Sequence, residues 1–384
     1  MNEVACGLRA LGHEVLVVAR ASATRSDPVS PVAGRRSSIL DDCPAPVRFV
    51  RPRKALALLG LRTVSKAMRD FRPDVVMERF YNFAGAGILL AHRRGIPSLL
   101  EVNAPIIDPP NSLKSRLDRL LLGRMRWWAV QQAKWSAAIV TPLNTTIPPE
   151  VPRDKINELP WGANVTRFEP QLRAIRSAEL NALARQYKLD RSRPIAVFLG
   201  SFRAWHGVAG FVEAARRLID KGSRLSFLAI GGGPELASFQ GHSDSWGLPE
   251  GRLVFTGPQP HDRVPLLLAL GDIGVAPFDL SAHEPLRTFG FYWSPLKVFE
   301  YMAMSMPVVT VDVPPLNSIV REGHEGLLYP SGDISALTSA LATLEVDNGL
   351  RAALGSSGRA RVVEHFSWQA HCKALDAILR EIVR

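Results

Sequence analysis

What the sequence lacks limits the classes of protein that it can encode. The chain has 384 residues but only three cysteines, Cys6, Cys43 and Cys372, which lie far apart. An odd, scattered set forms neither a disulfide framework nor a four-cysteine metal site, and it favours a reducing compartment. No apolar run reaches the roughly 18 residues that a membrane-spanning helix needs, and the first apolar stretch lacks the pattern of a secretory leader. We therefore expect a cytoplasmic protein.

Acidic residues are also few relative to basic ones. The chain has 47 lysines and arginines against 36 aspartates and glutamates, which gives a formal net charge of +11. Such a surplus suits nucleic acid, an anionic membrane surface or phosphorylated substrates. The basic residues are scattered in singles and pairs, without zinc-finger spacing or an aromatic RNA-binding strand motif. The pattern therefore disfavours nucleic acid and leaves the other two partners as candidates.

Apolar strand-like runs alternate with helical periodicity along most of the chain. The predicted strands are 14–19, 74–78, 98–102, 137–141, 194–199, 225–230, 253–255, 273–276 and 308–311; the predicted helices include 58–71, 83–94, 113–134, 177–187, 334–344 and 368–383. This alternation predicts an α/β protein with mostly parallel sheets covered by helices on both faces. A proline-rich passage, 142–170, divides the pattern in two. We expect two Rossmann-like, doubly wound domains that face a cleft, with ligands at the carboxyl ends of the strands.

The order of the first elements is unusual for such a sheet. A helix over 4–11 precedes the strand at 14–19, whereas a doubly wound sheet normally opens with a strand and a glycine-rich turn. The sequence therefore predicts that this first strand and its loop are missing. Two explanations stay open: a misassigned gene start, or a truncated and inactive member of its family.

The segment 292–303 predicts a helix that begins with an anion site. Ser294 is a favourable N-cap residue, and Pro295 suits the first helical position. The free N–H groups of the first turn, around Leu296, and the helix dipole together favour a bound phosphate.

Two charged residues follow on one face of this predicted helix, because Lys297 and Glu300 are three positions apart. Lys297 can add positive charge beside a phosphate, and Glu300 can accept hydrogen bonds from ribose hydroxyls. The alternative is a capped core helix in which these two residues form an ion pair.

The turn after the predicted strand 194–199 is a second candidate phosphate site. Gly200 and Ser201 begin a cationic loop that leads into a helix near Val208, as in nucleotide-binding α/β domains. The planar guanidinium of Arg203 could bind a pyrophosphate oxygen. His206 lies in the same loop, but a single histidine is as readily a hydrogen-bonded structural residue.

Two further turns carry weaker signals. Gly232 and Gly233 follow the strand 225–230, and glycine permits close backbone approach to a ligand. Gln259 lies in the passage 255–261, which could contact a base. Either passage is equally consistent with an ordinary turn.

Together these motifs resemble those of the family 4 retaining glycosyltransferases. The residues that carry the resemblance are Gly200-Ser-Phe-Arg203, Gly231-Gly-Gly-Pro234, Phe255-Thr-Gly257, Ser294–Ala303, Pro307-Val-Val309, Gly12-His-Glu-Val15 and Leu159–Asn164. The resemblance implies the GT-B fold, with an acceptor-binding domain over 1–165, a donor domain over 166–365, and the final helix, 366–384, packed on the first domain. It implies a nucleotide-diphosphate sugar as donor substrate, with neither a metal nor another cofactor.

The resemblance also assigns roles by position. Arg203 and Lys297 would hold the diphosphate and Glu300 the ribose, and these three are the expected catalytic residues, because cations and a helix terminus stabilise charge on the departing diphosphate. Two departures stand out. Tyr292 occupies the position of a second glutamate that the family often has, and His206 lies near the position of a family lysine that it could partly replace.

The first domain should bind the acceptor, whether an envelope, lipid-linked or small-molecule one. Arg79, Glu101 and Asn103 follow predicted strands and are candidate acceptor contacts; ordinary loop capping is the alternative. The segment 114–135 is basic and rich in tryptophan, so it could lie on an anionic membrane at its inner face or pack its tryptophans into the core.

We thus expect a retaining hexosyltransferase-like glycosyltransferase that needs no metal. An inactive nucleotide-sugar-binding homologue and a GT-B nucleotide-sugar epimerase stay open as alternatives.

Overall fold

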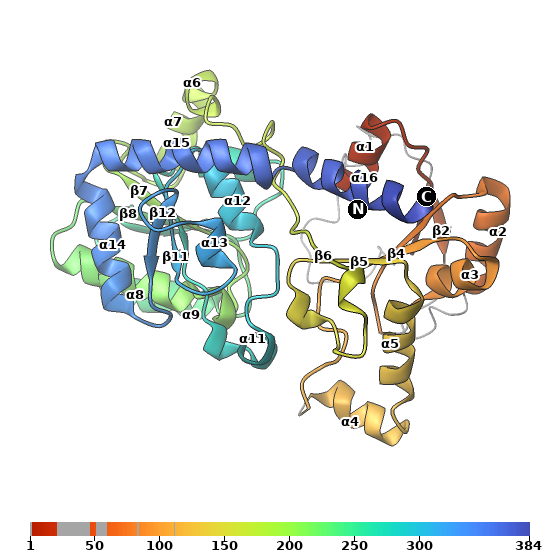
Figure 1. Ribbon diagram of the computed structural model, residues 1–384. Helices are drawn as coiled ribbons and strands as arrows, with labels where there is room; N and C mark the ends of the chain where they lie inside the picture. The colour runs from red at the N-terminus through yellow and green to blue at the C-terminus, as the bar shows by residue number, and fades with distance from the viewer. Residues whose placement is uncertain (1, 21–46, 51–59, 83, 111) are drawn as a thin grey trace. The chain divides into compact units, whose positions relative to one another are not determined.

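The structure is a computed structural model that describes residues 2–20, 47–50, 60–82, 84–110 and 112–384. The chain forms two compact units. The first unit comprises residues 1–161, 292–294 and 368–384, and the second comprises residues 162–291 and 295–367. Each unit contains parallel β-structure together with helices (Figure 1). The sequence predicts these boundaries at residues 165 and 366, a few residues from the divisions after 161 and 367.

The second unit is built on one six-stranded sheet, in the order β12-β11-β10-β7-β8-β9, and every neighbouring pair is parallel. The strands are β7 (Ile195–Leu199), β8 (Ser226–Ile230), β9 (Leu253–Phe255), β10 (Ile273–Ala276), β11 (Val308–Val311) and β12 (Gly326–Tyr329). The chain winds outward from β7 to β9, then returns to β10 on the other side of β7. This reversal creates the position at which doubly wound sheets bind ligands, beyond the carboxyl ends of the strands.

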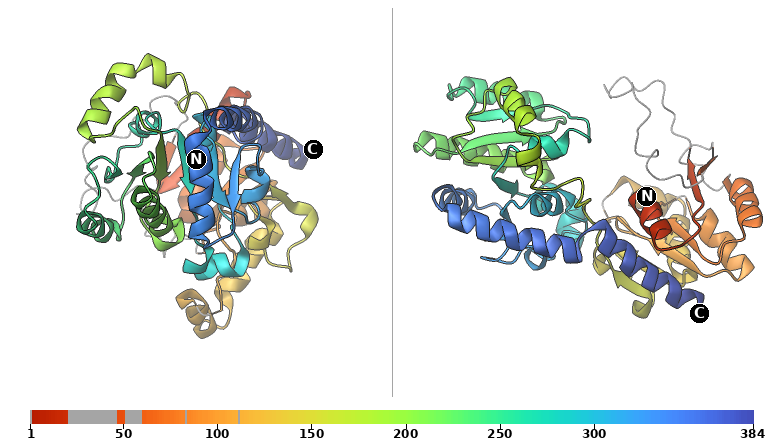
Figure 2. Two further views of the ribbon diagram at one scale, coloured as in Figure 1. Left: turned by 90° about the vertical axis from the view of Figure 1, so that its left-hand side faces the viewer. Right: turned by 90° about the horizontal axis from the view of Figure 1, so that it is seen from above.

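Helices lie on both sides of this sheet (Figure 2). They are α6 (Leu172–Ile175), α7 (Ser177–Gln186), α8 (Val208–Asp220), α9 (Leu236–Ser245), α10 (Val264–Leu268), α11 (Glu284–Phe289), α12 (Leu296–Ala303), α13 (Leu316–Ile319), α14 (Ile334–Val346) and α15 (Asn348–His365), with short 3₁₀ turns η5 (Ala204–His206) and η6 (Leu280–Ala282). The strands β8, β10 and β11 are buried along their whole length, as expected for parallel strands covered on both faces.

The first unit holds a four-stranded parallel sheet, β3-β4-β5-β6, and a separate parallel pair, β1-β2. The strands are β1 (Val17–Arg20), β2 (Val47–Val50), β3 (Val76–Arg79), β4 (Ser98–Glu101), β5 (Ala138–Thr141) and β6 (Ile156–Glu158); the helices are α1 (Asn2–Ala10), α2 (Leu61–Phe71), α3 (Ala86–Arg94), α4 (Leu113–Leu120), α5 (Arg124–Trp135) and α16 (Trp368–Val383), with 3₁₀ turns η3 (Asn144–Thr146) and η4 (Arg153–Lys155).

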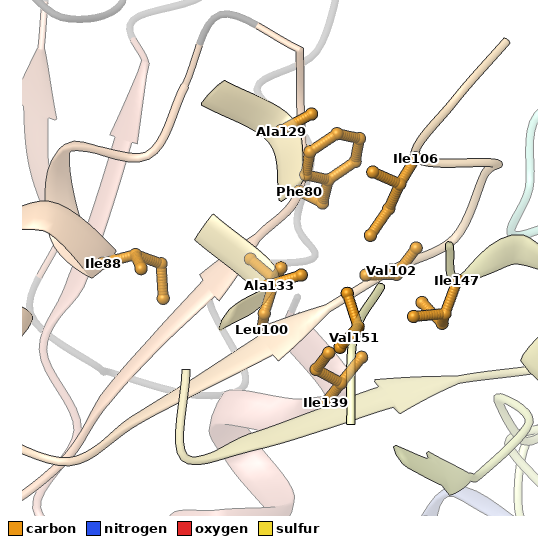
Figure 3. Packing of buried hydrophobic residues seen from close by; sticks show 10 residues of the cluster. All are labelled: Phe80, Ile88, Leu100, Val102, Ile106, Ala129, Ala133, Ile139, Ile147 and Val151. Atoms are coloured by element: carbon orange, nitrogen blue, oxygen red, sulfur yellow. The ribbon is translucent and has the colours of Figure 1, made fainter. Parts of the chain in front are cut away.

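Two apolar clusters cover the two faces of the four-stranded sheet. One contains Leu100 and Ile139 of the strands, packed against Ile88 of α3 and Ala133 of α5 (Figure 3). The other joins the sheet to α1 and to the C-terminal helix α16, which lie side by side (Figure 2). Burial of this apolar surface ties the last residues of the chain to the first unit.

A cavity of about 300 Å³ separates the two pieces of β-structure in the first unit. Its walls include residues 15–18 at β1 and residues 75–79 at β3, and Val4 and Leu8 of α1 also line it. Among the described residues, no strand pairs with the edge of β1 or of β3 on the cavity side. The sheet is therefore open between β1 and β3.

The predicted helix over 113–134 is two helices. Leu122 and Gly123 have positive φ angles of 54° and 75°, which end α4 and redirect the chain into α5. The tryptophans divide accordingly: Trp128 and Trp135 pack edge to face at 5.8 Å within the unit, whereas Trp127 is 58% exposed. In the described part of the chain, no helix has the length and apolar character needed to cross a bilayer.

Candidate functional site

The loop after β7 and the helix α12 meet at the reversal of the strand order in the second unit. The Lys297 ammonium donates a hydrogen bond to Nδ1 of His206 at 3.1 Å, and Nε2 of His206 lies 3.0 Å from Oγ of Ser201. A Cβ atom at Gly200 would lie 2.9 Å from both Lys297 Nζ and His206 Nδ1. Glycine at position 200 therefore lets the strand end pack directly on this chain of polar groups.

Tyr301 fixes α12 at this place in the sheet. Its buried hydroxyl accepts a hydrogen bond from the N–H of Leu199 at 2.7 Å and lies 3.3 Å from the carbonyl of Val275, to which it can donate. It thus bridges the ends of β7 and β10, the two strands on either side of the reversal. Lys297 lies one turn earlier on the same face of the helix. Tyr301 lies within the predicted helix over 292–303, but its sequence pattern alone does not indicate this role.

The predicted cap of α12 is wrong by one residue. The helix begins at Leu296, and Pro295 occupies the N-cap position, where no side chain caps the helix. Ser294 belongs to the first unit, and its hydroxyl accepts a hydrogen bond from the N–H of Trp161 at 2.8 Å. The Ser294 side chain therefore does not cap α12. The first N–H groups of α12 are thereby left for another acceptor.

The Lys297 side chain is held in an apolar enclosure. It is 7% exposed, and its ammonium lies 4.4 Å and 4.9 Å from the ring centres of Phe198 and Phe278. Burial lowers the pKa of Lys297 to about 7. The aromatic rings favour the charged form, so Lys297 is a cation whose charge depends on pH near neutrality.

His206 is a neutral partner of this lysine. Burial, and then the nearby charges of Lys297 and Arg203, lower the pKa of His206 to about 3. The neutral ring can accept from Lys297 at Nδ1 and donate from Nε2 to Ser201, which fixes its tautomer. His206 therefore positions Lys297 and does not replace the family lysine as a cation. Arg203 is exposed and makes no ion pair with any described carboxylate, so its charge remains available.

Glu300 does not form the alternative ion pair with Lys297, because the ammonium contacts His206 instead and no Lys297–Glu300 bridge occurs among the described residues. Glu300 is half-buried. Burial raises the pKa of its carboxyl to about 8, against the opposing charges of Lys297 and Arg167. Its carboxyl is thus poorly solvated, and hydroxyl donors from a ligand would stabilise the ionised form.

The glycine-rich turn after β8 is shaped by the neighbouring loop. A Cβ at Gly233 would lie 2.7 Å from the carbonyl oxygen of Phe202, and the Phe202 N–H donates to the Gly232 carbonyl at 3.0 Å. Close packing of two loops thus already requires small residues here. A ligand role for Gly232 and Gly233 stays a prediction.

Gln259 has a buried, unused acceptor. Its Nε2 donates to the carbonyl of Thr256 at 2.8 Å, while its Oε1 has no hydrogen-bond partner in the described part of the chain. A buried polar atom without a partner is uncommon and costs free energy.

In the first unit, the three predicted acceptor residues lie together at the ends of β3 and β4. Arg79 binds Glu101 through two hydrogen bonds of 3.1 Å, and Asn103 donates to the same carboxylate at 3.0 Å. Trp161, which the sequence analysis did not single out, donates to it at 2.8 Å and stacks its ring 5.0 Å from the Arg79 guanidinium carbon.

These contacts decide the charge state of Glu101. Burial raises its pKa, but the hydrogen bonds and charge of Arg79, followed by the bonds from Asn103 and Trp161, outweigh it, so the pKa lies below the usual value. Glu101 is therefore an ionised group whose oxygens are already occupied. It orients Arg79 and Asn103, which are the members of this cluster with donors to spare. The alternative of loop capping does not describe such a network.

Tyr292 is buried in the first unit, with its ring centre 4.6 Å from that of Trp293. A buried aromatic ring therefore occupies the position that the family resemblance associates with a second glutamate. Among the described residues, no group of three or more histidines, cysteines, aspartates or glutamates could hold a metal ion.

Comparisons with known proteins show the family and the fold of the chain. Residues 193–347 match the family model described as glycosyl transferases group 1, and residues 1–145 match the glycosyl transferase 4-like domain. The chain belongs to the GT-B glycosyltransferase superfamily. The crystal structure of Anabaena Alr3699/HepE in complex with UDP and glucose has the same fold, with a TM-score of 0.71 at 16% identity over 99% of this chain and 94% of that one. The predicted fold class is thereby confirmed.

The curated relatives of the chain include proteins of Streptomyces. The chain is 26% identical over 302 residues to alpha-D-kanosaminyltransferase of Streptomyces kanamyceticus, covering 77% of this chain and 73% of the relative. It is 27% identical over 282 residues to 2-deoxystreptamine N-acetyl-D-glucosaminyltransferase of Streptomyces fradiae, covering 71% of this chain but only 62% of that relative.

The role of Tyr301 predicts a specific loss of stability. Tyr301→Phe should lower the free energy of unfolding by about 1–3 kcal/mol, because the buried N–H of Leu199 would lose its acceptor. Denaturant unfolding of both proteins measures this difference. Tyr329→Phe, also at a buried tyrosine, is the control and should change stability less, since no hydrogen bond of the Tyr329 hydroxyl is found among the described residues. Equal effects would contradict the role of Tyr301.

Proposed function

We propose that this protein transfers a sugar from a nucleotide-diphosphate sugar to an acceptor, with retention of configuration and without a metal. The observation that carries this proposal is the arrangement in the second unit: an uncapped helix N-terminus beside Lys297, which His206 and Ser201 hold at the strand reversal. N–H groups and a buried cation at the carboxyl ends of parallel strands are suited to a diphosphate.

Each part of the donor has a partner in this unit. The diphosphate would accept from the first N–H groups of α12 and from Lys297, while the exposed Arg203 closes on it from solvent. Glu300 would accept from the ribose hydroxyls, and the unused Oε1 of Gln259 offers an acceptor to an N–H group of the base. Preorganised donors of this kind stabilise the negative charge that grows on a departing diphosphate.

The acceptor would bind at the Arg79 and Asn103 donors, which Glu101 and Trp161 orient. Such donors suit the hydroxyl groups of a sugar or of a lipid-linked or envelope saccharide. The names of the two Streptomyces relatives specify transfer of kanosaminyl and N-acetyl-D-glucosaminyl groups, which supports a sugar as the transferred group.

Ligand binding provides the first test. UDP-, GDP- and ADP-glucose are added separately to the purified chain, and one of them should raise the melting temperature by mass action. Release of the nucleoside diphosphate in the presence of candidate acceptors then measures transfer. Binding without transfer to any acceptor would favour the inactive homologue, and conversion of the sugar without an acceptor would favour an epimerase. No shift with any of the three would contradict the donor site.

Variants separate the ribose contact from the phosphate contact. Glu300→Gln should weaken binding of the nucleoside diphosphate by about ten-fold, since a charged acceptor of hydrogen bonds is lost, but should leave inorganic pyrophosphate binding unchanged. Lys297→Ala should weaken both ligands. Isothermal titration measures the affinities, and Glu179→Gln at an exposed site is the control. Equal loss of pyrophosphate affinity in Glu300→Gln would contradict the ribose role.

The lowered pKa of Lys297 predicts how affinity depends on pH. Below pH 7 the free protein already carries the charged ammonium that the diphosphate needs, so Lys297 adds no pH dependence there. As pH rises above 7 the ammonium loses its proton, and the contribution of Lys297 to nucleotide-sugar affinity, measured as the ratio of the parent affinity to that of Lys297→Met, should fall by up to about ten-fold per pH unit. Titrations at several pH values check this, and Lys297→Met should remove the decrease. A decrease that persists in Lys297→Met would assign it to another group.

We further propose that the open position between β1 and β3 receives an extended strand joined to the N-terminal end of α1. The second unit has the strand order β9-β8-β7-β10-β11-β12, in which the first strand, β7, lies beside β10. A strand between β1 and β3 would give the first unit the same order. Val4 and Leu8 of α1 line the cavity, so α1 would cover this strand as a crossover helix does.

This strand would place a further loop beside the candidate acceptor residues Arg79, Glu101 and Asn103. Its carboxyl end and the following loop would enter the sheet edge beside Arg79, which also lines the cavity. In the second unit the corresponding loop is Gly200–Gly207, which carries the candidate phosphate residues. The added loop would thus complete the acceptor side of the site.

An N-terminal extension tests this proposal directly. A strand of about six valine- and isoleucine-rich residues, followed by a glycine-serine turn, is fused before α1. Filling the cavity and pairing both strand edges should raise the melting temperature by about 2–4 °C for each kcal/mol gained. The control extension has proline at two central positions and cannot pair in a sheet interior. Equal melting temperatures for the two extensions would contradict the proposal, whatever the donor assays show.

A further inference from the structure

A row of large apolar side chains is exposed on α4 and the turn that follows it. No residue of α4 is buried. Leu113, Leu120 and Leu122 are 82%, 81% and 84% exposed, and Leu117 and Leu121 are exposed as well. Isolated exposed leucines are common on protein surfaces, but a contiguous apolar patch is typical of an interaction site.

The leucines share one face of the helix. Positions 113, 117, 120 and 121 follow the spacing that places side chains on a single stripe. The opposite face is attached to the unit: the hydroxyl of Ser115 donates to the carbonyls of Asp108 and Pro109, and the carboxylate of Asp118 accepts from the N–H of Met125 at 2.8 Å. The apolar stripe therefore points away from the rest of the first unit, at whose end α4 lies (Figure 1).

The turn after α4 extends the same surface. Leu122 has a φ of 54°, a conformation that costs a residue other than glycine about 1 kcal/mol or more. The side chain of Leu122 is exposed, and so is that of Trp127 in the first turns of α5. We refer to Leu113, Leu117, Leu120, Leu121, Leu122 and Trp127 as the α4 face.

Basic residues border the α4 face on both sides of the helix. Lys114 and Arg116 flank the leucine stripe, and Arg119 and Arg124 lie close by in the sequence. Arg116, Arg119 and Arg124 are exposed and form no ion pair with a described carboxylate. Long cationic side chains around an apolar stripe match the phosphate layer that surrounds the acyl region of a bilayer.

We propose that the α4 face docks the protein on the surface of a membrane rich in anionic phospholipid. The leucines and Trp127 enter the boundary between headgroups and acyl chains, and the arginines bind lipid phosphates. The positive charges around the α4 face favour an anionic membrane over an uncharged apolar partner. When the leucine stripe is covered, the unpaired arginines beside it need anions, which the lipid phosphates supply. The chain as a whole carries a net charge of +11, which favours the same surface.

Vesicle flotation tests the proposal with the full chain. Vesicles of phosphatidylcholine alone are compared with vesicles that contain about one-third phosphatidylglycerol, an anionic lipid. The protein should float with the anionic vesicles and stay behind with the neutral ones. High salt should reduce the binding, since it screens the attraction between the arginines and the lipid. Equal recovery with both compositions would overturn the proposal.

Two sets of variants separate the apolar contribution to membrane binding from the ionic contribution. Leu113→Ser, Leu120→Ser and Leu122→Ser together should abolish flotation, and their matched control is Ile175→Ser with Val346→Ser, at exposed apolar residues elsewhere. Arg116→Glu, Arg119→Glu and Arg124→Glu together should weaken binding by at least about five-fold for each charge removed. Their control is Arg93→Glu, Arg185→Glu and Lys221→Glu, at exposed residues outside the α4 face.

Fluorescence and light scattering distinguish membrane binding by the α4 face from binding of a second copy of the chain. In the parent protein, Trp127 fluorescence should shift to shorter wavelength on anionic vesicles, and this shift should be lost in Trp127→Phe. Variants of the α4 face that float like the parent would overturn the proposal. So would light scattering that finds a dimer in the parent and a monomer in the leucine variants without lipid, because the face would then bind a second copy of the chain.

Discussion

A single phenol hydroxyl fixes the geometry on which the candidate donor site depends. Tyr301 joins the N–H of Leu199 to the carbonyl of Val275, across the place where the strand order reverses. At such a reversal the connections leave the two neighbouring strands in opposite directions, and the backbone groups at the strand ends need partners. Tyr301 forms hydrogen bonds with two of these groups and so fixes the position of α12 relative to β7. This places Lys297 at the carboxyl ends of the strands.

The polar groups around Lys297 explain its chemistry as a unit. Burial of the ammonium between the rings of Phe198 and Phe278 lowers its pKa, although the rings themselves favour the charge, and neutral His206 accepts one of its hydrogen bonds. The ammonium therefore has no anionic partner within the described part of the protein, and a bound anion would strongly stabilise its charged form. A fully exposed lysine would gain less, because water already solvates it.

The candidate binding residues of the two units differ in how their positive charges are paired. In the second unit Arg203 and Lys297, the cations of the candidate phosphate site, form no ion pair with a described carboxylate. In the first unit Arg79 is paired with the buried Glu101, and the carboxylate also gathers Asn103 and Trp161. Paired charges of this kind give orientation more than net attraction. Anion binding in one unit and hydroxyl recognition in the other are consistent with these arrangements.

The sequence by itself determined the α/β class and the buried strands, because their periodicity is local and strong, and the resemblance of its motifs to a known family implied the GT-B fold. It also selected Lys297, Glu300 and the Arg79, Glu101 and Asn103 set. Only the tertiary structure decided how they are used. Ser294 bonds Trp161, 133 residues away, instead of capping α12, and His206 meets Lys297 from 91 residues away. The break at Leu122 and the division of the tryptophans likewise depend on packing between distant segments, which local propensity does not record.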